Sequence, residues 1–181
     1  MGTVSQALIR PAATADRDAI RDLCLRAFDP AENELVARLA VDLLLMNEDP
    51  GSGTHCLVAE VGDRVAGYIA FSPVTVDTSA DWLGSILAPL AVSPGLQRAG
   101  IGSRLVGHGL ERVAGTAAVV VFVYGDPTYY GRFGFSAEAA ARFPPPCAPR
   151  YPFGWQAKVL RGDGTGGRLS CVPPLREPAL W

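Results

Sequence analysis

The segment that most constrains the fold is residues 86–123, where two apolar strand patterns flank a glycine-containing turn and an amphipathic helix pattern. Residues 118–123 are apolar throughout, as expected for a strand that is covered on both faces. Ile101, Leu105 and Val113 belong to a set of apolar side chains at helical spacing within residues 100–114. Strand, turn, helix and strand in this order predict a mixed α/β (α+β) fold in which the helix packs on one face of a sheet.

The rest of the chain adds a strand, two helices and a hairpin before this segment, and a short helix and two strands after it. The expected positions are a strand at 7–10, a helix capped by Thr14 or Asp16, a helix begun by Glu32, hairpin strands at 55–61 and 65–76 around Gly62-Asp63, a loop at 78–81, a short helix after Asp126-Pro127, and strands at 156–160 and 168–172. Prolines predict an irregular segment at 143–152 and a non-helical tail. A chain of 181 residues with 49% hydrophobic residues fits one domain over residues 1–181, with a core at about 7–160 and an extension at 161–181.

Composition excludes several classes of function. A formal charge of −2 and a pI of about 5.7 argue against nucleic acid as the partner. The sequence has no apolar run of about 18 residues and no export signal in residues 1–10, so we expect no membrane partner and a cytoplasmic protein. The four cysteines form no Cys-x-x-Cys pair, which predicts no metal site, and His55 and His108 have no visible catalytic partner.

The turn at Gln97-Arg98-Ala99-Gly100-Ile101-Gly102-Ser103 has the properties of a phosphate site. A helix begins with unpaired N–H groups and a partial positive charge, and glycine lets a phosphate approach the main chain closely. Two other phosphate motifs do not fit. Gly102-Ser103-Arg104 lacks the lysine of a P-loop, and Leu105 stands where a dinucleotide motif needs its third glycine. The alternative that the glycines only permit close strand-to-helix packing remains open.

Two linked motifs in this region resemble those of the GNAT superfamily of N-acetyltransferases. Gln97-x-x-Gly100-x-Gly102 resembles the family's cofactor turn, and residues 87–94 resemble the strand that precedes it. The run Gly-Asp-Pro-Thr-Tyr-Tyr-Gly-Arg-Phe-Gly-Phe at 125–135 is similar to that of a bacterial subgroup of predicted N-acetyltransferases. The resemblance covers about residues 7–160 and is specific at 86–135.

The resemblance implies a mostly antiparallel, twisted sheet with helices on both faces and a V-shaped splay between its two central strands. It implies acetyl-CoA as cofactor, with the pantetheine arm paired to main-chain groups after Pro89, where we expect a bulge or the splay. The implied cofactor-binding residues are Leu90, Ala91, Val92, Gln97, Arg98, Ala99, Gly100, Ile101, Gly102, Ser103, Asp126 and Tyr130. Relatives often carry glycine where this chain has Arg98 and a basic residue where it has Ala99, so we expect a weaker but surviving phosphate affinity.

The implied reaction moves an acetyl group from acetyl-CoA to a primary amine by direct attack in a ternary complex. Tyr130 stands at the family's general-acid position, and a neutral phenol can donate to the departing thiolate. A backbone N–H of Leu90 or Ala91 is the implied oxyanion donor. The sequence shows no evident general base. Glu34 is our first candidate, and Glu60, Asp77 and Asp126 are the others. An acceptor amine with a pKa of about 8 needs no protein base.

Two other functions remain open from the sequence. One is a CoA-binding sensor or degenerate family member without transferase activity, and the other is an interaction domain without a CoA site. The acceptor, a small molecule or a peptide, is not identified by any motif, and the apolar late strands favour a homodimer.

Overall fold

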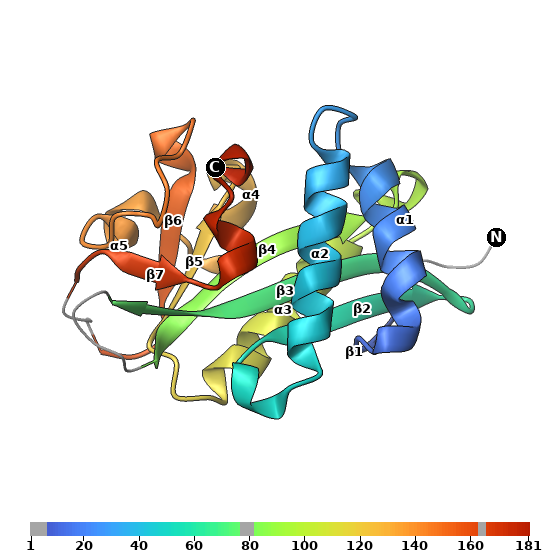
Figure 1. The fold of residues 1–181 in the computed structure, drawn as a ribbon, viewed down its shortest axis with the longest axis horizontal. Coiled ribbons are helices and arrows are strands. Elements are labelled where there is room, and N and C mark those ends of the chain that lie inside the picture. The colour runs from blue at the N-terminus through green and yellow to red at the C-terminus, as the bar shows by residue number, and fades with distance from the viewer. Residues whose placement is uncertain (1–6, 77–81, 163–165) are drawn as a thin grey trace. The chain divides into compact units, whose positions relative to one another are not determined.

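The computed structural model describes residues 7–76, 82–162 and 166–181, and Figure 1 shows its fold. The helices are α1 (Arg17–Ala27), α2 (Asn33–Asn47), α3 (Ile101–Ala114), α4 (Pro127–Tyr130) and α5 (Ala137–Ala140). The strands are β1 (Leu8–Pro11), β2 (His55–Val61), β3 (Arg64–Val76), β4 (Trp82–Val92), β5 (Val120–Tyr124), β6 (Trp155–Val159) and β7 (Leu169–Cys171). The expected loop at 78–81 lies outside the described residues, as do residues 163–165 between the two last expected strands.

The strands form one seven-stranded sheet in the order β1-β2-β3-β4-β5-β6, with β7 paired to β3. The pairs β1–β2, β3–β7 and β5–β6 are antiparallel, and β4–β5 is parallel. This confirms the expected fold class, a mixed and mostly antiparallel open sheet.

The described residues fall into two compact units. The first holds residues 7–70 and 89–109, and the second holds residues 71–76, 82–88, 110–162 and 166–181. The single domain that we expected from the sequence stays a prediction.

In the first unit, helices cover both faces of the sheet. Successive residues on a strand face opposite sides of the sheet. The contacts of the neighbours Gly67 and Tyr68 on β3 therefore show what covers each face. The Tyr68 hydroxyl donates to the Ala40 carbonyl oxygen of α2 at 3.0 Å. A Cβ on Gly67 would lie 2.8 Å from Cδ1 of Leu105 in α3. The α2 helix therefore packs on one face, beside α1 (Figure 1), and α3 packs on the other.

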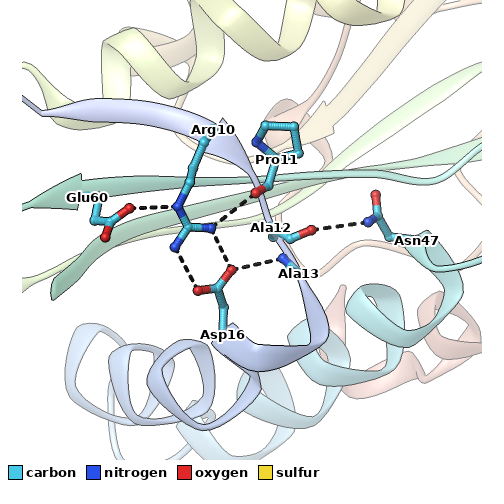
Figure 2. A network of polar contacts seen from close by, with 7 residues as sticks. All are labelled: Arg10, Pro11, Ala12, Ala13, Asp16, Asn47 and Glu60. Carbon is cyan, nitrogen blue, oxygen red and sulfur yellow. Dashed lines mark hydrogen bonds and ion pairs between the residues drawn. The ribbon is translucent and has the colours of Figure 1, made fainter. Parts of the chain in front are cut away.

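A charged network ties β1 to β2 and to the start of α1 (Figure 2). The Arg10 guanidinium donates to both carboxylate oxygens of Asp16 at 2.8 Å, and its Nε donates to Glu60 at 2.6 Å. The side chain of Asp16 is 11% exposed, and the hydrogen bonds from Arg10 hold the pKa of its carboxyl below the usual range. We expected Thr14 or Asp16 to cap the helix. Asp16 does precede α1, but its carboxylate makes no cap bond to that helix; it pairs with Arg10 and accepts from the Ala13 N–H at 2.9 Å.

In the second unit, β5 lies between β4 and β6. Its parallel ladder with β4 runs from Gly84–Val120 to Leu87–Val123, and its antiparallel ladder with β6 runs from Val120–Val159 to Tyr124–Trp155. Phe122 stacks on Trp155 with ring centroids 5.2 Å apart, and Phe143 contacts Phe122 edge-on at the same distance. This aromatic cluster joins buried side chains of β5 and β6 with Phe143 in the core of the second unit.

Three features differ from the sequence-based expectations. The β4 strand begins at Trp82 and runs through Pro89, which lies beyond the last residue pair with β5, so the missing N–H of the proline removes nothing from that ladder. The tail predicted to be non-helical instead forms two short 3-10 turns, Pro173–Arg176 and Pro178–Leu180. The α5 helix was not expected, and its start is capped by the Ser136 hydroxyl, which accepts from the Ala139 N–H at 3.1 Å.

Candidate functional site

The turn at residues 97–103 is open and its N–H groups are free. Residues 97–100 are exposed, and α3 begins at Ile101. The Leu96 N–H donates to Ser93 before the turn, and the Arg104 N–H donates to Gly100 after it. Between these two bonds, no main-chain N–H of residues 97–103 donates to another group in the described part of the protein. Unpaired N–H groups at the start of a long helix form a geometry that binds an anion.

Arg98 adopts an unusual backbone conformation within this turn. Its φ is +61°, and it is the single non-glycine residue with a positive φ among the described residues. Gly100 also has a positive φ, +86°, and glycine adopts it without strain. The side chain of the neighbouring Gln97 donates from Nε2 to the Val92 carbonyl oxygen at 3.3 Å and so links the turn to the end of β4. Arg98 therefore stands at a strained position, the one where the resemblance leads us to expect glycine.

We expect Arg98→Gly to be more stable than Arg98→Ala by about 1 kcal/mol, because only glycine relieves the strain of a left-handed backbone. The alanine variant is the matched control, since both variants remove the guanidinium and only one changes the backbone preference. Urea unfolding of the two variants measures the difference. Equal free energies of unfolding would mean that Arg98 is not strained.

Tyr130 ends the short helix α4. The helix starts as expected from the sequence: the Asp126 carboxylate accepts from the Thr128 N–H at 2.8 Å, and Pro127 occupies the first turn. The Tyr130 ring packs edge-on against Tyr129 and Phe135, with centroids 5.0 and 5.9 Å away. Burial, together with Tyr129, raises the pKa of the Tyr130 phenol well above its usual value of 10. Tyr130 therefore keeps its proton at neutral and mildly alkaline pH and can donate a hydrogen bond.

The other cofactor residues expected from the sequence lie on β4 and α4. Leu90, Ala91 and Val92 form the end of β4, and Ala91 is buried. The turn and this strand end belong to the first unit, and Tyr130 and Asp126 belong to the second. One carboxylate oxygen of Asp126 is engaged in capping α4.

The carboxylates considered as general bases are mostly engaged elsewhere. Glu34 lies at the start of α2, 72% exposed, in an ion pair with Arg21 of α1 at 3.0 Å. Glu60 is bonded to Arg10, and Asp77 lies outside the described residues. The role of Glu34 as a base stays a prediction, and its exposed ion pair favours a structural role.

Neither a metal-ligand cluster nor a membrane-spanning helix is present among the described residues. In residues 7–76, 82–162 and 166–181, no three His, Cys, Asp or Glu side chains are grouped as a metal site would require. No helix within the same ranges has the length and apolar character needed to cross a membrane.

Comparison with known proteins identifies the family of the chain. The model of the acetyltransferase (GNAT) domain matches residues 52–137, which include the turn and Tyr130. The N-acetyltransferase YjhQ of Escherichia coli, described as uncharacterized, is 31% identical over 92% of each chain. The similarly described N-acetyltransferase YhbS of the same organism is 35% identical, over 91% of this chain and 94% of its own.

Two solved structures share the fold. That of Escherichia coli YhbS in complex with CoA has a TM-score of 0.80 at 31% identity, covering 95% of this chain and 93% of its own. A GNAT acetyltransferase of Brucella melitensis in complex with acetyl-CoA has a TM-score of 0.75 at 29% identity, covering 94% and 98%. The chain belongs to the GNAT family of acetyltransferases.

Proposed function

We propose that this protein transfers an acetyl group from acetyl-CoA to a primary amine of an acceptor. The observation that carries the proposal is the turn at residues 97–103, which is exposed at residues 97–100 and whose described main-chain N–H groups make no internal hydrogen bond. A diphosphate supplies several oxygen acceptors to such a turn. The relatives YhbS and the Brucella melitensis protein, solved with CoA and acetyl-CoA, support the same cofactor here.

The proposed chemistry is a direct attack within a ternary complex. The acceptor nitrogen forms a bond to the acetyl carbon, the carbon–sulfur bond breaks, and the nitrogen gives up a proton. Main-chain groups of Leu90, Ala91 and Val92 hold the pantetheine arm, and the N–H of Leu90 or Ala91 stabilises the oxyanion. Tyr130 donates a hydrogen bond to the departing sulfur. Because its pKa is raised, Tyr130 stabilises the thiolate by that bond and keeps its own proton.

No protein base is required by this scheme. The carboxylates of Glu60 and Asp126 are already bonded, and Glu34 is exposed. An acceptor amine that is partly neutral at the working pH can attack directly and release its proton to water.

The proposal is tested by CoA binding and by thiol release from acetyl-CoA with a panel of amines. At a hundredfold excess over its Kd, CoA is expected to stabilise the protein by about 2.7 kcal/mol, a rise in Tm of about 5–10 °C. Gly102→Asp, which places a carboxylate in the turn, is expected to abolish that rise. Absence of any stabilisation by CoA would contradict the cofactor site. Stabilisation without thiol release on any amine would indicate a CoA-binding protein without transferase activity.

A further inference from the structure

Gln156 is a buried polar residue on β6, the strand at one edge of the sheet. It lies on β6 opposite Val123 of β5, and only 1% of its surface is exposed. Its amide nitrogen donates to the carbonyl oxygens of Gly125 at 3.1 Å and Gly154 at 3.2 Å. Its amide oxygen has no hydrogen-bond partner within the described residues. Burying an unpaired oxygen costs stability, and an apolar side chain at this position would avoid that cost. The two hydrogen bonds from the amide nitrogen therefore indicate a role for Gln156.

Those bonds fix the peptide groups around Gly125, the residue that leaves β5 and precedes α4. The Gly125 N–H donates to the Gly154 carbonyl oxygen at 2.9 Å, and its own carbonyl oxygen accepts from Gln156. The Gly154 N–H in turn donates to Tyr151 at 2.8 Å. Gly125 is therefore held through both of its polar main-chain groups.

Gly125 is in direct contact with the ring of Tyr130. A Cβ on Gly125 would lie 2.5 Å from Cε2 and 3.1 Å from Cδ2 of Tyr130, too close for any side chain. Phe135 packs edge-on against the same ring. The position of the phenol thus depends on the position of the Gly125 main chain.

We propose that Gln156 is a positioning residue for Tyr130. It holds the main chain of Gly125, and Gly125 holds the Tyr130 ring where its hydroxyl can donate to the departing sulfur. This inference rests on the proposed function of Tyr130. A shift of a catalytic group by about 1 Å can slow a reaction by up to about a hundredfold. The contact between Gly125 and the Tyr130 ring is therefore expected to affect kcat.

The test is a double-mutant cycle of Gln156→Met and Tyr130→Phe, with kcat and the KM for acetyl-CoA measured for each variant. Methionine keeps the length of the side chain but removes its two donor bonds. We expect Gln156→Met to lower kcat about tenfold, with KM within about twofold of wild type. In the Tyr130→Phe background the same change is expected to lower kcat less than about twofold, because no hydroxyl is left to misplace.

The cycle separates the failure of this inference from that of the proposed function. If Gln156→Met lowers kcat by the same factor in both backgrounds, Gln156 does not act through Tyr130, and the positioning role is overturned while the role of Tyr130 stands. If Tyr130→Phe keeps the wild-type kcat, both roles are overturned.

Gly125→Ala tests the same contact while leaving Gln156 intact. The φ of Gly125 is not positive, so alanine fits the backbone, and its methyl group displaces the Tyr130 ring. We expect an approximately tenfold loss of kcat that falls below about twofold when Tyr130 is phenylalanine. Ser72→Ala is the control, because it removes another buried, unpaired oxygen of the same unit; its kcat should match wild type. A wild-type kcat for Gly125→Ala would overturn the proposal.

Discussion

Replacing Tyr130 by phenylalanine is expected to lower kcat by about 100-fold and to leave the KM for acetyl-CoA within about twofold. The phenol hydroxyl is the one part of the side chain that phenylalanine lacks, so the packing against Phe135 and Gly125 is retained. The hydrogen bond to sulfur grows stronger as negative charge develops, and its loss therefore affects the transition state more than the bound cofactor. Steady-state kinetics with the best amine of the panel give both constants.

Tyr129→Phe is the matched control, because it removes the neighbouring hydroxyl from the same helix. Its kcat is expected to stay within about twofold of wild type. Since burial raises the pKa of Tyr130, the phenol stays protonated at alkaline pH, and the wild-type rate should rise with pH as the acceptor amine loses its proton. Tyr130→Phe should show a profile of the same shape at a lower rate. A fall of the wild-type rate between about pH 8 and 9 that is absent from the variant would contradict this assignment.

The elements around the site could be predicted from sequence because their signals are local. The strand, the turn with Gly100 and Gly102, and the helix that follows lie within one continuous segment, and Asp126-Pro127 starts α4 through bonds within three residues. Every strand and long helix expected there is confirmed, apart from shifts at their ends. The role of Tyr130 at the departing sulfur and the cofactor contacts came from the resemblance and stay proposals.

What could not be predicted depends on contacts between distant residues. Glu60 bonds to a guanidinium 50 residues earlier, and Gln156 bonds to a carbonyl oxygen 31 residues earlier. Gln156 and Lys158 alternate with apolar residues at 155–159, a pattern typical of a strand with one polar face, and only the fold shows that Gln156 is buried and holds Gly125. Asp16 has the side chain of a good helix cap, but its pairing with Arg10 is visible only in the fold, where the carboxylate also accepts from the Ala13 N–H.

Asp16→Ala is expected to destabilise the protein by about 2–3 kcal/mol. The carboxylate accepts two bonds from Arg10 and one from the Ala13 N–H, and it is nearly buried. Its loss leaves Arg10 with Glu60 as a partner, which keeps the cost below that of a fully unpaired buried charge. Urea unfolding at pH 7 measures the effect. Glu34→Ala, which removes an exposed ion pair with Arg21, should cost less than about 0.5 kcal/mol.

The Arg10–Asp16 pair is expected to lose its contribution to the free energy of unfolding at acidic pH. The pKa of Asp16 is lower in the folded protein than in the unfolded chain. In the unfolded chain it is about 3.9. Its contribution is therefore complete above that unfolded value and is lost as the pH falls through the lower, folded value. The difference in unfolding free energy between wild type and Asp16→Ala should be constant from pH 7 to about 5 and shrink below about 4. A difference that stays constant down to pH 2, or one no larger than that of Glu34→Ala, would show that the Arg10–Asp16 pair contributes no net charge stabilisation.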